Sequence, residues 1–250
     1  MRVLISAGGT SESIDSVRSV TNHSTGRLGS IIADRFAKDG AHVIYICGER
    51  ADLPQSLGIE IVRIKDVRSL VAAMERLFSE YKFDCVIHSM AVSDFTPKGS
   101  VSIDEMVEGV LCAAIEANFD TCVLRDEIKT AVLSSFSAAE ESKISSKSSN
   151  LMMLFENTPK IIERIKKIQP ETILVGFKLL SDVDEPELLK AAFDLMERNL
   201  CDFVLANDLK DIDGDSHKAI LIDRSGILHR ADTKHDIAEA IYNSVKGANK

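Results

Sequence analysis

Short apolar runs rich in β-branched residues alternate with amphipathic stretches along most of the chain, and this alternation constrains the fold more than any other feature. Near-continuous apolar runs predict strands that are covered on both faces. They lie at Val3–Ser6, His42–Cys47, Ile59–Ile64, Asp84–Ser89, Leu151–Phe155, Thr172–Gly176 and Asp202–Ala206. Helical spacing of apolar residues predicts helices at Gly29–Lys38, Val67–Glu80, Ile161–Ile168, Glu185–Asn199 and Thr233–Val245. The sequence therefore predicts an α/β fold, a three-layer sandwich around a mainly parallel sheet.

Three local signals refine this outline near the C-terminal half. Thr158 before Pro159 predicts an N-cap with proline at the first helical position. The turn Asp223–Gly226 between two apolar runs predicts a hairpin. Gly247 is expected to stop the last helix.

Residues 96–142 are less regular than the rest of the chain. This segment is serine-rich and charged, and helical spacing occurs only over Met106–Ala117. It still contains apolar residues that can be buried, so we expect an inserted flap rather than a linker. Residues 1–250 are expected to form one domain that carries this flap.

Composition and charge exclude several classes of protein. Thirty Lys and Arg against 39 Asp and Glu give a net charge of −9, which argues against general nucleic-acid binding. No window approaches the roughly 18 apolar residues of a membrane span, and the opening MRVLISAGGT becomes glycine-rich too early for a signal peptide. The 5 cysteines form no C-x-x-C pair and no zinc-binding pattern. We therefore expect a cytoplasmic protein without nucleic-acid or membrane partners.

The common nucleotide-binding and catalytic motifs are missing. None of the 13 glycines precedes a lysine, which excludes a Walker A loop. The segment Ala7–Glu12 after the first strand (AGGTSE) does not match G-x-G-x-x-G. Tyr242 and Lys246 fit the Y-x-x-x-K pattern of short-chain dehydrogenases, but they lie on the last helix, away from any strand end. No G-x-S-x-G elbow is present either.

One stretch, Gly8–Gly29 (GGTSESIDSVRSVTNHSTGRLG), does indicate a ligand. A glycine pair ends the first strand, and small hydroxyl residues precede a helix that begins near Leu28. Free N–H groups and the helix dipole favour an anion there. The candidate phosphate cradle consists of Gly8, Gly9, Thr10, Ser24, Thr25 and Gly26. The alternative is an ordinary helix cap beside a polar loop.

The same stretch closely resembles the opening signature of phosphopantothenate–cysteine ligases, the coenzyme A pathway enzymes that join cysteine to 4′-phosphopantothenate. The resemblance continues in the order of the family's motifs over most of the chain. The further blocks are Met90–Phe95 (MAVSDF), Lys143–Ser146 (KISS), Asn157–Ile162 (NTPKII), Val175–Phe177 (VGF) and Ala206–Asp208 (AND). Six ordered blocks are far more specific than a single motif.

This resemblance implies a Rossmann-like fold and a homodimer with its active sites near the subunit interface. It also implies the standalone bacterial form, without the flavin-dependent decarboxylase domain that many bacteria fuse in front. Two features depart from the family: the segment before Lys143 is long, and Ser146 stands where a second lysine is usual, with Lys147 one place later.

The family's chemistry supplies an expected role for each matching residue. A nucleoside triphosphate, CTP more often than ATP in bacteria, activates the phosphopantothenate carboxylate as an acyl-nucleotide, and the cysteine amine then attacks it. Asn22 would hold the acyl carbonyl through its uncharged amide, although a turn residue is the plainer interpretation. Lys143 would offset charge on the triphosphate. No residue stands out as the general base for the amine.

Four further residues receive expected roles with alternatives. Asp94 is a candidate ligand for Mg²⁺ bridging the phosphates, or a strand-end carboxylate that caps a loop. Arg18 would bind the substrate phosphate, or pair with Asp15 on the surface. Ala91 and Phe95 would contact the nucleotide base.

Two other functions fit the sequence less well. A nucleotide-binding module without catalysis would need a phosphate-binding lysine but not the asparagine. An NAD(P)-dependent reductase would need the fingerprint loop that is missing here.

Overall fold

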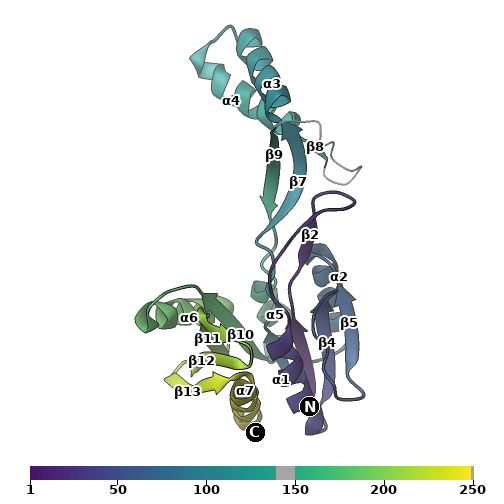
Figure 1. Ribbon diagram of the computed structural model, residues 1–250, viewed down its shortest axis with the longest axis vertical. Helices are drawn as coiled ribbons and strands as arrows, with labels where there is room; N and C mark the ends of the chain where they lie inside the picture. Colours follow the sequence, from purple (N-terminus) through teal and green to yellow (C-terminus); the bar gives the residue numbers. More distant parts are fainter. Residues whose placement is uncertain (139–149, 249–250) are drawn as a thin grey trace. The chain divides into compact units, whose positions relative to one another are not determined.

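The computed structural model describes residues 1–138 and 150–248. The chain divides into two compact units (Figure 1). Unit 1 comprises Met1–Thr10, Asn22–Val92 and Lys160–Lys250. Unit 2 comprises Ser11–Thr21 and Ser93–Pro159, so it includes the segment expected to be a flap.

The core of unit 1 is an eight-stranded sheet with the order β13-β12-β11-β10-β6-β1-β4-β5. The six strands from β11 to β5 pair in parallel, and the C-terminal hairpin β12–β13 adds two antiparallel strands at one edge. The predicted α/β fold with a mainly parallel sheet is therefore confirmed. The strands are β1 (Arg2–Ala7), β4 (His42–Gly48), β5 (Glu60–Ile64), β6 (Cys85–His88), β10 (Ile173–Leu180), β11 (Phe203–Asp213), β12 (Ser216–Asp223) and β13 (Gly226–Thr233).

Helices cover both faces of this sheet and give the three predicted layers (Figure 1). On one face α1 and α7 bury side chains such as Phe36 and Ile241 against the odd-numbered residues of β1. On the other face α2, α5 and α6 bury Leu77, Ile165 and Met196 against Leu4 and its neighbours. The helices are α1 (Arg27–Lys38), α2 (Val67–Glu80), α5 (Ile162–Ile168), α6 (Glu185–Asn199) and α7 (Lys234–Ala248).

Unit 2 has two small sheets and a helical hairpin. The strands β2 (Ser11–Ser13) and β3 (Ser19–Thr21) form a short antiparallel hairpin. A three-stranded antiparallel sheet has the order β8-β7-β9, with the helices between β7 and β8. These elements are β7 (Phe95–Ser102), α3 (Ile103–Glu116), α4 (Thr121–Ser134), β8 (Ser137–Ala138) and β9 (Leu151–Asn157).

Two predicted helix boundaries are wrong. Thr158 does not cap α5, because its N–H donates to the carbonyl of Asp94 and its hydroxyl donates to the carbonyl of Ser93, which prolongs the pairing of β7 with β9. The helix begins only at Ile162. Gly247 does not stop α7, which continues to Ala248 with Gly247 outside the left-handed region.

The Y-x-x-x-K pattern on α7 has a structural role. Tyr242 is buried and meets Phe36 edge-on, with ring centroids 5.3 Å apart. The Arg35 guanidinium lies 3.4 Å from the Tyr242 ring centroid, and Lys246 forms an ion pair with Asp39. These contacts hold α7 against α1, so helix packing accounts for both residues of the pattern.

Candidate functional site

The best candidate site in unit 1 lies where β1 and β6 end. The chain goes from β1 to β4 on one side and later places β6 on the other side, so the strand order reverses at β1. Ligands of open α/β sheets bind at the carboxyl ends of the strands at such a point. Here Gly9 bridges Ala91, the Ala91 N–H donates to the Gly8 carbonyl at 2.8 Å, and the Thr10 N–H donates to the Ala91 carbonyl at 3.2 Å.

The N-terminus of α1 comes close to this point because two glycines adopt backbone conformations that other residues rarely take. Gly8 has φ +78° and Gly26, the N-cap of α1, has φ +74°. A Cβ on Gly26 would lie 3.0 Å from the Gly8 nitrogen. The Tyr45 hydroxyl donates to the Gly26 carbonyl and so helps to hold the start of α1 in this position. The first strand and the start of α1 therefore meet, although 19 positions separate Ala7 from Gly26.

The N–H groups of the expected cradle are not all available to a ligand. Thr10 donates to Ala91, and Ser24 donates to the Asn22 carbonyl at 3.0 Å. In the described part of the chain, the N–H groups of Thr25 and Gly26 have no hydrogen-bond acceptor. The Arg27 N–H donates to the Thr25 hydroxyl at 3.3 Å, but together with the remaining free amides of the first turn of α1 the Thr25 and Gly26 N–H groups can face an anion. Fewer N–H groups of the candidate anion site are thus available than the sequence predicted.

Asn22 lies beside the glycine pair with a fixed side-chain orientation. Its Nδ2 donates to the Ala91 carbonyl at 2.9 Å, and its N–H donates to the Thr10 carbonyl at 3.4 Å. Only the amide nitrogen can donate to a carbonyl, so this bond defines which way the amide points. The side chain is half-buried, and among the described residues Oδ1 and the second hydrogen of Nδ2 have no hydrogen-bond partner.

A methyl group on Gly9 should displace Asn22. A Cβ at this position would meet the Asn22 carbonyl oxygen at 2.7 Å, which is backbone and cannot turn aside. We expect Gly9→Ala to lower the rate of the reaction proposed below about a hundredfold, the typical effect of a shift near 1 Å at a reacting group. Gly247→Ala is the matched control, because its Cβ would meet nothing. Unchanged activity in Gly9→Ala would contradict this geometry.

The other predicted site residues lie in unit 2 or outside the described residues. Arg18 is paired with Asp15, whose Oδ2 accepts bonds from Nε at 3.0 Å and from Nη2 at 2.5 Å; the Asp15 side chain is buried and that of Arg18 is exposed. Asp94 is exposed and accepts a main-chain bond from Thr158, and Phe95 at the start of β7 is 53% exposed. Lys143, Ser146 and Lys147 lie outside the described residues.

No group of three or more His, Cys, Asp or Glu residues in the described ranges is placed to hold a metal ion. Asp94 therefore belongs to no such group of three within those ranges. Within the same ranges, no helix is long and apolar enough to cross a membrane.

Comparison with known proteins identifies the family. The model of the DNA/pantothenate metabolism flavoprotein C-terminal domain matches residues 1–105 and 105–248. The chain belongs to this family. The candidate site at the ends of β1 and β6 is therefore that of a member of this family.

Three relatives illustrate the match. A curated relative, the coenzyme A biosynthesis bifunctional protein CoaBC of Thermococcus kodakarensis, is 30% identical over 98% of this chain and 51% of its own length. The crystal structure of the DNA/pantothenate metabolism flavoprotein from Streptococcus pneumoniae is 34% identical, with a TM-score of 0.81 and 99% coverage of both chains. A Cab2 mutant in complex with phosphopantothenate-cysteine has the same fold, with a TM-score of 0.70 at 17% identity over 99% of this chain and 86% of its own. The chain spans about half the length of the curated relatives it matches.

Two buried polar groups of this family member were missed by sequence reasoning. His88, the last residue of β6, is buried, and its Nδ1 lies 2.7 Å from the Ser6 hydroxyl of β1. Burial lowers the pKa of His88 to about 4, so its ring is neutral at pH 7. The signal that was available is a histidine in an otherwise apolar strand, which must find a partner when it is buried.

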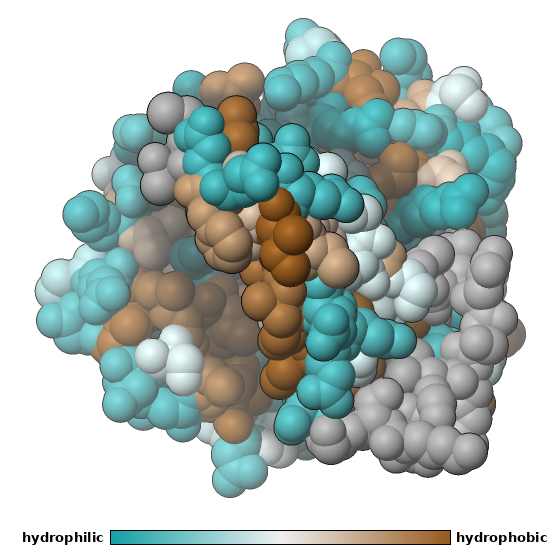
Figure 2. Space-filling view, turned by 90° about the horizontal axis from the view of Figure 1, so that it is seen from above, coloured by the Kyte–Doolittle hydropathy of each residue, from teal (hydrophilic) through white to brown (hydrophobic). Residues whose placement is uncertain are grey.

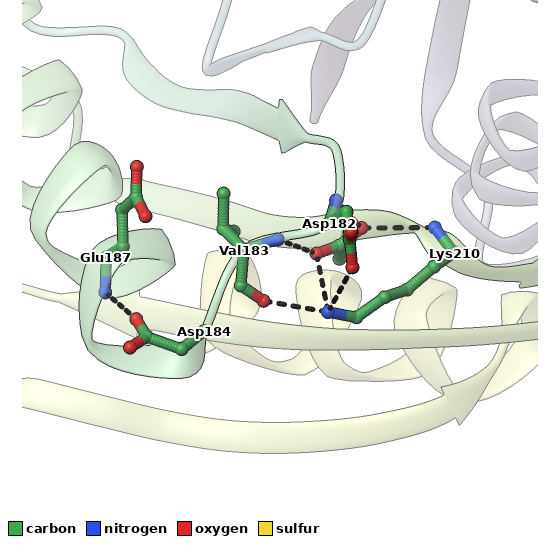
Figure 3. A network of polar contacts seen from close by, with 6 residues as sticks. Asp182, Val183, Asp184, Glu187 and Lys210 are labelled. Carbon is green, nitrogen blue, oxygen red and sulfur yellow. Dashed lines mark hydrogen bonds and ion pairs between the residues drawn. The ribbon is translucent and has the colours of Figure 1, made fainter.

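Asp208 is the second such group, and it ends the A-N-D block of the family. Its carboxylate accepts the N–H groups of Asp182, Val183 and Lys210 at 2.9, 2.9 and 3.1 Å. The Lys210 ammonium lies 3.4 Å from it and donates to the Val183 carbonyl (Figure 3). Burial alone would raise the pKa of Asp208, but these donors outweigh burial and lower the pKa to about 2. The carboxylate therefore fixes the turn between β10 and α6.

Replacing Asp208 with asparagine should loosen this turn and remove one acid-sensitive contribution to stability. Because the folded pKa is below the unfolded value of about 3.8, the carboxylate stabilises the fold fully above pH 4 and progressively less down to pH 2. We expect Asp208→Asn to lower the melting temperature by roughly 5 °C at pH 7. The difference from the parent should shrink between pH 4 and 2. Exposed Asp232→Asn is the control, and a pH-independent difference would argue against the charged contact.

Proposed function

We propose that the chain is a nucleotide-dependent ligase that joins L-cysteine to (R)-4′-phosphopantothenate in coenzyme A biosynthesis. The observation that carries the proposal is Asn22 at the strand-order reversal, oriented by Ala91 and packed on Gly9. A site that only binds a nucleotide needs amides for phosphates, but it has no use for an oriented neutral amide beside them. Membership of a family whose curated relatives include coenzyme A biosynthesis bifunctional proteins supports the same function.

The proposed reaction has two steps. The phosphopantothenate carboxylate attacks the α-phosphorus of CTP and expels pyrophosphate, which gives an acyl-cytidylate. The cysteine amine then attacks the acyl carbon, CMP leaves with the bonding electrons of the broken acyl–oxygen bond, and the amine proton passes to the phosphate or to solvent. Negative charge develops on oxygen in both steps, so fixed donors supply most of the stabilisation.

The residues near the glycine pair divide this work between them. The amides of Thr25, Gly26 and the first turn of α1 would bind phosphate oxygens, aided by the helix dipole. The free hydrogen of Asn22 Nδ2 would bind the acyl oxygen, where a neutral donor does not repel the mixed anhydride. Ala91, whose carbonyl orients that amide, acts as a positioning residue.

Residues of the remaining motifs would have the roles that the family resemblance implies. Lys143 would neutralise the departing pyrophosphate as a point charge. Mg²⁺ bound by phosphate oxygens would supply further charge, and one exposed carboxylate, Asp94, suits the one or two protein ligands that this ion usually takes. Arg18 would bind the phosphate of phosphopantothenate, and Phe95 the nucleotide base.

The test is an incubation of the purified chain with 4′-phosphopantothenate, Mg²⁺ and either CTP or ATP, with and without cysteine. We expect pyrophosphate and CMP when all components are present, and an enzyme-held acyl-nucleotide when cysteine is withheld. Release of CDP and inorganic phosphate would point to an acyl phosphate and refute the two-step scheme. A faster reaction with ATP than with CTP would change the nucleotide but not the scheme.

A further inference from the structure

The turn of the β2–β3 hairpin is organised by one buried carboxylate. The Asp15 side chain is fully buried, although the residues 16–18 that follow it are exposed. Its Oδ1 accepts the N–H groups of Val17 and Arg18 at 2.9 and 2.8 Å. Its Oδ2 accepts Nε and Nη2 of Arg18 at 3.0 and 2.5 Å. One oxygen therefore closes the turn, and the other holds one edge of the Arg18 guanidinium.

This pair differs from an ordinary ion pair on a protein surface. In the pair Arg76–Glu80 the two side chains are 49% and 43% exposed, so water solvates both charges. In the pair Arg18–Asp15 the carboxylate is buried and accepts four hydrogen bonds, while 47% of the arginine side chain is exposed. A carboxylate is costly to bury unless it is paired and hydrogen-bonded in this way. The buried carboxylate thus anchors an arginine that solvent and ligands can reach.

The main chain of Arg18 is held by the same loop. Its carbonyl accepts the N–H groups of Ile14 and Asp15 at 2.8 and 3.3 Å. Val17 beside it is 66% exposed, but apolar residues are common on the surface of this protein (Figure 2), so Val17 does not distinguish the turn. The distinguishing feature is an accessible arginine whose backbone and guanidinium are both held by its own loop.

Given the function proposed above, on which this inference rests, we propose that Asp15 is a positioning residue that orients Arg18 for the phosphate of phosphopantothenate. The two expectations for Arg18, a phosphate ligand and a partner of Asp15, are then compatible. A guanidinium binds phosphate through a planar fork of N–H groups, so its orientation matters. An arginine that is oriented in advance loses less conformational entropy when the anion binds, which increases the affinity.

The charge of Asp15 has the opposite effect from its positioning role. Asp15→Asn removes a negative charge beside Arg18, which by itself favours an anionic substrate. The asparagine Oδ1 can still close the turn, but its NH2 group would then face the Nε and Nη2 donors and release the guanidinium. Positioning predicts that this variant binds phosphopantothenate more weakly, whereas charge alone predicts tighter binding.

Steady-state kinetics of the purified full chain test the proposal with phosphopantothenate and with pantothenate, which lacks the phosphate. We expect Asp15→Asn to raise the KM for phosphopantothenate about tenfold, to change kcat by less than about twofold, and to leave the KM for pantothenate unchanged. Asp223→Asn is the matched control, because Asp223 also closes a turn, accepting the Ser225 N–H at 2.7 Å, but pairs with no arginine in the described ranges. Asp15→Ser, whose hydroxyl can also close such a turn, replaces Asp15→Asn if that variant does not fold.

An Arg18→Lys background separates positioning from a purely structural role. Lysine keeps the charge but lacks the planar fork, so adding Asp15→Asn should raise the KM by less than about twofold further. A tenfold effect that persists in this background, or an unchanged or lower KM in Asp15→Asn alone, would overturn the proposal. A parent chain that forms no product refutes the proposed function and this inference with it, whereas an active parent with an unaffected Asp15→Asn variant refutes only the inference.

Discussion

The Asn22→Ala variant is expected to transfer cysteine about a hundred- to a thousandfold more slowly than the parent, the usual cost of removing one donor to a developing oxyanion. Formation of the acyl-cytidylate should slow much less, because in that step negative charge develops mainly on phosphate oxygens, which the amides at the start of α1 would bind. The substitution is therefore expected to slow the second half-reaction, transfer to cysteine, far more than the first. This result depends on the proposed function.

Folding of the same variant should be almost unaffected. The Ala91 carbonyl loses the Nδ2 donor but keeps the Thr10 N–H at 3.2 Å, so no acceptor is left unpaired. The Asn22 backbone, which Gly9 contacts, stays in place. A loss of activity with an unchanged melting temperature would thus report chemistry rather than structure.

Two single-turnover measurements distinguish the half-reactions. Pyrophosphate release without cysteine reports the first, and CMP release after cysteine is added to the preformed intermediate reports the second. Asn243→Ala, which removes an exposed asparagine from α7, is the control and should change neither rate. An equal loss in both half-reactions would remove the role assigned to Asn22.

The elements of unit 1 could be predicted because local and tertiary signals agree there. Residues 67–80 are helical as expected, with apolar residues on one face and Asp66 as a capping residue that accepts the Ser69 N–H. The parallel strands were recognisable because both of their faces are buried, which leaves an uninterrupted apolar run. The secondary structure of such segments can therefore be predicted without knowing which segments they contact.

Unit 2 was harder to predict because its strands are held by partners far along the chain. Only α3 and β9 were anticipated, and β7 contains a proline and a glycine that weaken any strand signal. The short strands β2 and β3 depend on Asp15, which accepts the N–H groups of Val17 and Arg18 and so closes the turn. A polar side chain that folds back on its own loop leaves no periodicity to detect.

The candidate site was predicted in its residue types but not in its contacts. The glycine pair and the start of α1 were identified together, and the structure brings Gly8 and Gly26 into contact. The bond from Asn22 to Ala91 spans 69 residues and follows only from the pairing of β1 with β6. The bond from the Thr10 N–H to the Ala91 carbonyl also joins distant segments, whereas the Ser24 N–H donates to the Asn22 carbonyl two residues before it.

Acid should destabilise the chain strongly between pH 6.5 and 4, because two histidines are buried in the neutral form. Burial lowers the pKa of His88 from near 6.5 to about 4. Burial, followed by the charge of Lys234, lowers that of His217 to about 4 as well. Neither ring nitrogen of His217 has a hydrogen-bond partner in the described part of the chain, so nothing in those ranges compensates a proton there.

The sign follows from proton binding. Between pH 6.5 and 4 the unfolded chain binds a proton at each histidine and the folded chain does not, so falling pH favours unfolding. A shift of 2.5 units corresponds to about 3 kcal/mol for each group, and about 6 kcal/mol for both. Since the free energy of unfolding of a domain is about 5–15 kcal/mol, protonation of these two rings should remove much of it. The stabilising contribution of the Asp208 carboxylate is lost only below pH 4, so the two effects occupy separate ranges of pH.

Urea unfolding at pH 7, 6, 5 and 4.5 measures this dependence. His217→Leu should be at least as stable as the parent at pH 7, because it removes two unpaired buried nitrogens, and its stability should fall about half as steeply with pH. His88→Asn should also fall less steeply, at a lower starting stability, because the Ser6 hydroxyl loses its ring partner. Exposed His235→Gln should keep the parental slope. If a double variant that carries both His217→Leu and His88→Asn loses stability with falling pH as steeply as the parent, the acid sensitivity must come from carboxylates and not from the two histidines.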